Sequence, residues 1–128
     1  GMDDMRLDQF TACVMHSDME KSGDFQCSNQ KVNQLQSNIA WGQRSNFLDI
    51  PTDCPQRDER LGWTGDAQVF ARTATYNMNV DPFYTRWLYS VRDNQGDDGS
   101  YANYIPWSVS RLTARRMAEV PWDGWKPA

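Results

Sequence analysis

The sequence has little of what several common kinds of protein need. Its 128 residues include one histidine, His16, and three cysteines, Cys13, Cys27 and Cys54, which lack the spacing of a zinc site and predict no bound metal. No apolar run approaches the ~18 to 20 residues that cross a bilayer, which excludes a transmembrane helix and predicts no membrane partner. The acidic first four residues are followed by no apolar region, which argues against a signal peptide.

Positive charge is also scarce. Lysine and arginine number 13 against 17 aspartates and glutamates, a formal net charge of −4, which argues against a nucleic-acid partner. The chain is 39% hydrophobic and 23% charged, too apolar for a disordered tail, and its length fits one ordinary domain. Six tryptophans stand among many carboxylates, a composition that suits a carbohydrate site and suits an ordinary core equally well.

The apolar pattern predicts a mainly α fold, in which an N-terminal strand-like piece precedes three or four helices. Residues 10–15 are apolar between polar neighbours, which is typical of a short strand, and residues 25–27 form a second extended piece. Helical periodicity and capping residues follow, with expected helices at residues 28–44, 64–78, 81–93 and 111–119. Ser28, Thr64 or Asp66, and Asp81 are the expected caps.

The predicted helices carry apolar faces. Val32, Leu35, Ile39 and Gly42 share one face of the first helix. Trp41 and Trp87 fall within helices, which favours a core position over a sugar-binding one. Three helices alone cannot cover all of these apolar faces. Some apolar side chains are therefore expected to be exposed and to favour association with other molecules. The expected exposed residues are Leu48, Phe70, Trp87 and Leu88.

The loop at residues 51–66 carries the candidate chemistry. Four acidic residues, Asp53, Asp58, Glu59 and Asp66, are crowded into a stretch shaped by proline and glycine. Crowded carboxyls and a nearby aromatic, Trp63, can keep one carboxyl neutral as a general acid, which is what glycoside hydrolysis needs. The alternative is a solvated loop with surface ion pairs, which composition alone favours.

The order of residues in this loop favours the glycoside-hydrolysing site over the solvated loop. The run DCPQRDERLGWTGDAQ at residues 53–68 resembles the signature of bacterial α-L-rhamnosidases of glycoside hydrolase family 78. The resemblance extends over roughly residues 12–98 and fades beyond about Gly99. It implies a catalytic domain that is an (α/α)6 barrel of the six-hairpin glycosidase type, preceded by a β-sandwich. It also implies inverting hydrolysis of terminal α-L-rhamnose. Some members of the family bind Ca²⁺, but this sequence shows no ligand set for it, and no cofactor is expected.

The resemblance implies a role for each matching residue. Glu59 corresponds to the general acid, and Asp53 and Asp66 to carboxylates that hold the rhamnose hydroxyls. Trp63 corresponds to an aromatic that packs against the sugar, while Arg57 contacts the sugar or fixes Asp53. Cys54 has no nearby histidine that could activate it and is interpreted as a packing residue, and His16 as a surface residue.

A complete barrel needs about twelve helices, so the resemblance implies a fragment. Residues 1–27 are expected to end an upstream sandwich or linker, residues 28–98 to start the barrel, and residues 99–128 to be a divergent tail. The general base of the family lies farther downstream, so this chain alone is expected to be inactive. The alternative function is a non-catalytic carbohydrate-binding or association fragment. The expected partner is a rhamnose-containing glycoside or polysaccharide, and a full-length relative is expected in the periplasm or outside the cell.

Overall fold

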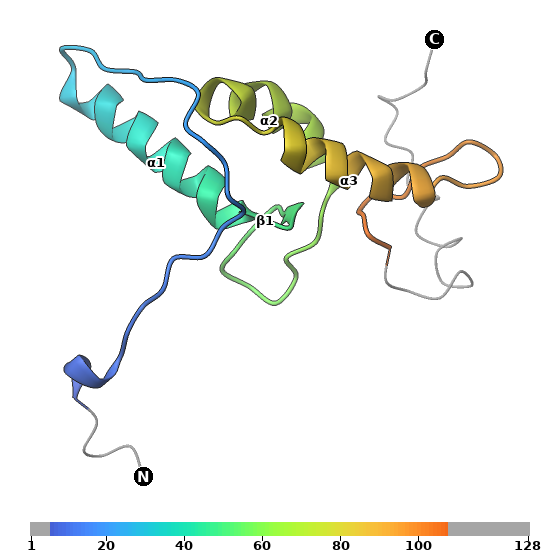
Figure 1. The fold of residues 1–128 in the computed structure, drawn as a ribbon, viewed down its shortest axis with the longest axis horizontal. Coiled ribbons are helices and arrows are strands. Elements are labelled where there is room, and N and C mark those ends of the chain that lie inside the picture. Colours follow the sequence, from blue (N-terminus) through green and yellow to red (C-terminus); the bar gives the residue numbers. More distant parts are fainter. Residues whose placement is uncertain (1–5, 108–128) are drawn as a thin grey trace.

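Three α-helices, a very short hairpin and one 3-10 turn are the regular elements of the described residues. The computed structural model describes residues 6–107 (Figure 1). Its elements are the 3-10 turn η1 (Leu7–Gln9), α1 (Gln30–Asn46), β1 (Phe47–Leu48), β2 (Ile50–Pro51), α2 (Thr64–Asn77) and α3 (Asp81–Asp93). The chain within residues 6–107 is therefore mainly helical, as predicted, and the expected fourth helix at 111–119 lies outside the described residues. None of its helices is both long and apolar enough to pass through a bilayer.

Polar side chains attach α1 to α2. Gln43 of α1 is buried, accepts a hydrogen bond from Asn77 Nδ2 and donates through Nε2 to the carbonyl of Ala74. Gln36 Nε2 donates to the oxygen of the same Asn77 side chain. Buried amides are costly unless paired, so these bonds fix how the two helices meet.

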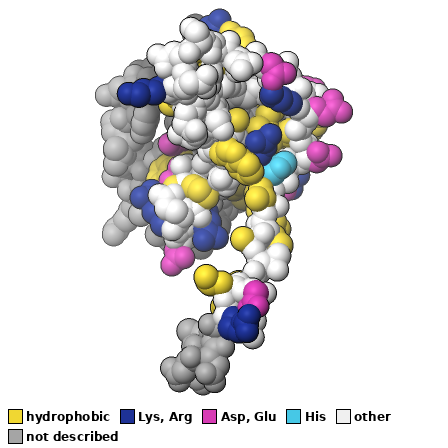
Figure 2. Space-filling view, turned by 90° about the vertical axis from the view of Figure 1, so that its left-hand side faces the viewer, with side chains coloured by type: hydrophobic (Ala, Val, Ile, Leu, Met, Phe, Trp, Pro, Cys, Tyr) yellow, Lys and Arg dark blue, Asp and Glu magenta, His cyan; other side chains and the backbone are white. Residues whose placement is uncertain are grey.

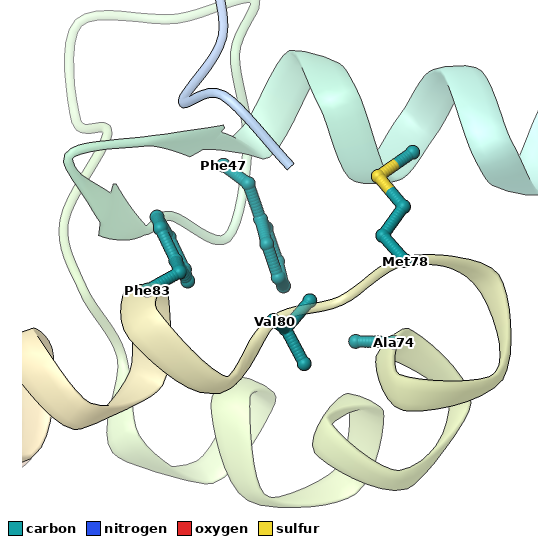
Figure 3. Packing of buried hydrophobic residues seen from close by; sticks show 5 residues of the cluster. All are labelled: Phe47, Ala74, Met78, Val80 and Phe83. Carbon is teal, nitrogen blue, oxygen red and sulfur yellow. The ribbon is translucent and has the colours of Figure 1, made fainter. Parts of the chain in front are cut away.

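The core surrounds Phe47, the first residue of the hairpin (Figure 3). Its ring stacks on Phe83 with centroids 4.6 Å apart and meets the edges of Phe70 and Tyr84. Ala74 and other small or flexible side chains complete the cluster, so β1, α2 and the start of α3 share one core. The hairpin itself turns at Asp49, whose φ of 69° lies in the left-handed region that aspartate tolerates better than most residues.

An extended segment, residues 17–22, joins the hairpin to the corner between α2 and α3. Ser17 N donates to the carbonyl of Phe47, and Ser17 Oγ accepts from Asp49 N. Farther along, the carbonyl of Glu20 accepts from Asn79 N, and Ser22 N donates to the carbonyl of Asn77. Figure 1 shows this segment running between α1 and the other two helices.

The strands predicted at residues 10–15 and 25–27 are wrong. Both stretches lack strand structure. The nearest strand-like pairing in the described N-terminal region is an isolated bridge between Lys21 and Met78. The reason is that a strand needs a neighbour to receive its backbone hydrogen bonds, and the described residues offer one only to residues 17–22. The hairpin of β1 and β2 was not predicted. The expected caps Ser28, Thr64 or Asp66, and Asp81 are wrong, because the residues at the N-cap positions are Asn29, Trp63 and Val80.

Apolar side chains remain on the surface, as expected, although not all the expected ones. Leu48 and Leu88 are about half exposed, and Phe70 is partly covered. Trp87 is buried, because it packs with Ala67 and Ile105, while Trp41 is 50% exposed and does not belong to the core. Figure 2 shows hydrophobic side chains on the face that is turned toward the viewer and along the projecting N-terminal segment.

Candidate active site

The loop that connects β2 to α2 is closed at its base by the main chain. Asp53 N donates to the carbonyl of Leu61, which brings the two ends of the loop together. Between them the chain turns at Arg60, whose φ of 50° is uncommon for a residue that is not glycine. Arg60 Nε donates to the carbonyl of Arg57 and holds this turn. The loop therefore presents Arg57 and Glu59 from a fixed backbone.

Glu59 is held through both of its carboxylate oxygens. Trp63 Nε1 donates to Oε1 at 2.6 Å, and Arg57 lies 2.7 Å from Oε2. The side chain of Glu59 is 30% exposed, so it remains open to solvent on one side. Charged and aromatic donors thus fix the orientation of the carboxylate without burying it.

Asp53 shares the same arginine. Its Oδ2 accepts from Arg57 at 3.1 Å, and its side chain is only 10% exposed. The second oxygen, Oδ1, is buried and has no hydrogen-bond partner among the described residues. Burial tends to raise the pKa of Asp53, but hydrogen bonds from Cys54 and Arg57 outweigh it and hold that pKa below its ordinary value.

The shift of Asp53 makes a prediction about acid stability. A carboxyl whose pKa is lower in the folded state stabilises the fold above its unfolded pKa, here 3.8, and this contribution is lost as pH falls through the folded value. We expect the free energy of unfolding of Asp53→Asn to fall less than that of the parent chain between pH 5 and pH 2. Urea unfolding at several pH values in this range, followed by circular dichroism, measures the difference. Asp8→Asn, which changes an exposed carboxylate paired with Arg6, is the control and should keep the acid dependence of the parent chain. Equal acid dependence in all three proteins would contradict the prediction.

Asp66 lies apart from this cluster. It stands in the first turn of α2, is exposed, and makes no hydrogen bond or ion pair with the described residues. Asp66 and Asp53 line the same cavity of about 570 Å³, which α1, the hairpin and α2 enclose together with Tyr84. Burial raises the pKa of Tyr84 to about 12, so its hydroxyl stays protonated at neutral pH. Asp53 is therefore the residue that connects the cavity with the Arg57–Glu59–Trp63 cluster.

Cys54 lies beside the two carboxylates of the cluster. It is buried, in agreement with a packing role, and its sulfur lies within 4.8 Å of carboxylate oxygens of Asp53 and Glu59. These three residue types can ligate a divalent cation. Arg57 already supplies a cation to both carboxylates, so the arrangement is complete as an ion-pair network.

Residues 102–107, which the sequence analysis assigned to a divergent tail, form a wall of the site. Thr64 N donates to the carbonyl of Asn103, and Ile105 N to the carbonyl of Gly62. The ring of Tyr104 meets Trp63 edge-on at 5.4 Å. No local spacing could have revealed these contacts, because they join positions about 40 residues apart in the sequence.

Comparisons with known proteins find relatives in both sequence and structure. Residues 20–126 match the family model described as the bacterial alpha-L-rhamnosidase 6 hairpin glycosidase domain. An alpha-L-rhamnosidase of Formosa agariphila is 55% identical over 93 residues, which are 73% of this chain and 10% of that protein.

Solved structures of alpha-L-rhamnosidases also match the chain. The crystal structure of Streptomyces avermitilis alpha-L-rhamnosidase complexed with L-rhamnose is 49% identical, with a TM-score of 0.73, and the match covers 77% of this chain and 10% of that one. Native alpha-L-rhamnosidase from Aspergillus terreus is 50% identical with a TM-score of 0.68, over 71% of this chain and 11% of that one. The chain thus spans about a tenth of the length of the relatives it matches.

Proposed function

The chain belongs to the bacterial alpha-L-rhamnosidase six-hairpin glycosidase family, and on this premise we propose that it provides the acid side of a rhamnoside-hydrolysing site. It is a fragment of the catalytic domain. The proposed reaction is inverting hydrolysis of a terminal α-L-rhamnoside, with Glu59 as the general acid. The observation that carries the proposal is the two-sided hold on Glu59 by Trp63 and Arg57.

A general acid must give its proton to the leaving glycosidic oxygen, and so its carboxyl has to stand at a fixed place beside the bond. Trp63 and Arg57 supply that fixed place. Each oxygen of Glu59 has one of these contacts, and the side chain is 30% exposed, so a substrate can reach it from the solvent side. Arg57 is the more exposed of the two partners, with 59% of its side chain open to solvent, and we propose that this contact opens when substrate enters.

The remaining predicted site residues are proposed to hold the sugar. Asp53 lines the cavity with a carboxylate that is 10% exposed, and Asp66 offers an exposed carboxylate on the same cavity. Both carboxylates can accept hydrogen bonds from sugar hydroxyl groups. The ring of Trp63 offers an apolar surface for a sugar face. The Streptomyces avermitilis enzyme, crystallised with L-rhamnose, supports rhamnose as the sugar.

The isolated chain is expected to release no p-nitrophenol from p-nitrophenyl α-L-rhamnopyranoside. An inverting enzyme places its base ~6.5 to 9.5 Å from the acid, on the other side of the bond, and the proposed base belongs to the part of the domain that this chain does not include. The measurement is a rate with the parent chain and with Glu59→Gln, both checked for folding by circular dichroism. Turnover by the parent chain that disappears in Glu59→Gln would contradict the proposed inactivity and would show that a base is present.

Rhamnose binding tests the proposed site without turnover. We expect L-rhamnose to bind weakly to the parent chain in a calorimetric titration, and Asp66→Ala to weaken binding at least ~5-fold, because the variant loses a charged acceptor worth ~1 kcal/mol or more. Asp58→Ala is the matched control, since Asp58 is an exposed carboxylate of the same loop outside the proposed site. An unchanged affinity in Asp66→Ala would remove Asp66 from the proposed site.

The same titration tests the alternative function, which is a non-catalytic carbohydrate-binding or association fragment. A chain that binds rhamnose without turning over substrate behaves as a carbohydrate-binding fragment, and the exposed carboxylate of Asp66 on the cavity favours binding by the chain itself. The exposed side chains of Val32, Leu35 and Trp41 on α1 favour self-association, or association with the remainder of such a domain.

A further inference from the structure

The acid loop is fastened to a segment that lies far from it in the sequence. Thr64 N and Thr64 Oγ1 both donate to the carbonyl of Asn103 at 2.9 Å, and Ile105 N donates to the carbonyl of Gly62 at 2.9 Å. These bonds flank Trp63 on both sides. The main chain of residues 103–105 therefore runs alongside the residue that contacts Glu59.

The segment is itself anchored to α3. Ile105 is fully buried, and its carbonyl accepts from Trp87 Nε1 at 3.2 Å. Trp87 belongs to the core and is buried. The position of residues 103–105 is consequently determined by the body of the fold and does not depend on the acid loop alone.

Tyr104 extends from this anchored backbone toward Trp63. Its ring is buried, meets the Trp63 ring edge-on at 5.4 Å, and is stacked at 4.5 Å by Trp107 on another side. Aromatic pairs of this geometry are stabilised beyond the burial of their surface and prefer defined orientations. The orientation of the Trp63 ring matters, because its Nε1–H reaches Glu59 Oε1 at 2.6 Å only from one side of the indole.

We infer that Tyr104 is a positioning residue, which holds the Trp63 indole so that its N–H fixes Glu59. The inference rests on the proposed function for its meaning in catalysis, but the contact chain Tyr104–Trp63–Glu59 stands on geometry alone. It adds to the site a residue from outside the loop at 51–66. Tyr104 contributes no proton and touches no substrate, and it acts only through Trp63.

Indole NMR signals test the inference without substrate. The chain has six tryptophans, so 15N-indole labelling gives six N–H signals, and Trp63→Phe identifies that of Trp63. We expect the Trp63 signal to move in one step with pH as Glu59 gains a proton, and Glu59→Gln to abolish this step. Asp53 and Arg57 also face Glu59, so Asp53→Asn serves as a control that keeps the step.

The decisive variant is Tyr104→Leu. The Trp63 signal should shift toward that of an exposed indole and lose at least half of its pH step, while the Trp87 signal, which reports the bond to Ile105, stays in place. Tyr104→Phe should restore both features, because the ring remains. If Tyr104→Leu fails to fold, Tyr104→Met repeats the test with an unbranched side chain.

Three results would overturn the inference. One is a Trp63 signal that keeps its position and pH step in the leucine or methionine variant. A second is the loss of the Trp87 signal together with that of Trp63, which would make Tyr104 a general packing residue. The third is a parent chain whose Trp63 signal shows no step that depends on Glu59. None of these readouts requires rhamnose binding or turnover, so failure of the proposed function would be seen separately.

Discussion

Phe47→Ala is expected to unfold the chain. Phe47 is 3% exposed, and its ring contacts those of Phe70, Phe83 and Tyr84. Replacing a buried phenylalanine by alanine costs ~3 to 5 kcal/mol, since the cavity that is left adds to the lost burial. A domain of ordinary stability has ~5 to 15 kcal/mol in total, and the partial core of this chain places it toward the lower end.

Leu48→Ala provides a matched control for this result. Leu48 follows Phe47 directly in β1, but its side chain is 47% exposed, so its truncation should cost well under ~1 kcal/mol. Urea unfolding of the three proteins, followed by circular dichroism at 222 nm, gives the comparison. A Phe47→Ala chain that unfolds at the same urea concentration as Leu48→Ala would show that the core is not centred on Phe47.

Gly62→Ala is expected to have the largest effect within the site. A β-carbon at this position would lie 2.2 Å from the carbonyl oxygen of Ile105, which is a main-chain atom and cannot rotate away as a side chain could. Relief requires residues 103–105 to move off the acid loop, with loss of the bond from Ile105 N to Gly62 O. We expect a loss of ~2 to 3 kcal/mol in the free energy of unfolding, the upper part of the range for overpacking.

The same substitution at Gly42 should act in the opposite direction. Gly42 lies inside α1, and no atom stands within 4 Å of where its β-carbon would be. Alanine at an open helical position stabilises by ~0.4 to 1 kcal/mol, because the unfolded chain loses freedom. Thermal unfolding of both variants is the measurement, and a Gly62→Ala midpoint at or above that of the parent would refute the close approach.

Local patterns predicted the helices of this chain well. Each helix is defined by residues within a few turns of one another, and Asp81 with Pro82 starts α3 within one residue of the expected position. The burial of the helices was predicted less well. Trp41 and Trp87 both sit in helices, yet only Trp87 faces a neighbour, because burial depends on which other element lies against each helix face.

The candidate site was likewise predicted in part from local sequence. The motif placed Asp53, Arg57, Glu59 and Trp63 in one loop, and the structure brings these four side chains into one connected cluster. Their roles toward a sugar stay predictions. Asp66 belongs to the same motif but lies away from the cluster, because α2 begins between Trp63 and Asp66 and turns the chain. Tyr104 was not predicted at all, since its contact with Trp63 spans 41 positions of sequence.

The extended segment at residues 17–22 has a consequence for the order of events during synthesis. Glu20 precedes Asn79, to which its carbonyl is bonded, by 59 positions, since 79 − 20 = 59. At ~5 to 20 residues per second, a ribosome needs roughly 3 to 12 s to make that interval. Throughout this time the backbone of the segment has no native partner at its α2–α3 end. The nascent chain therefore presents an unpaired extended edge before its own helices can cover it, which is the kind of surface that holding chaperones shield.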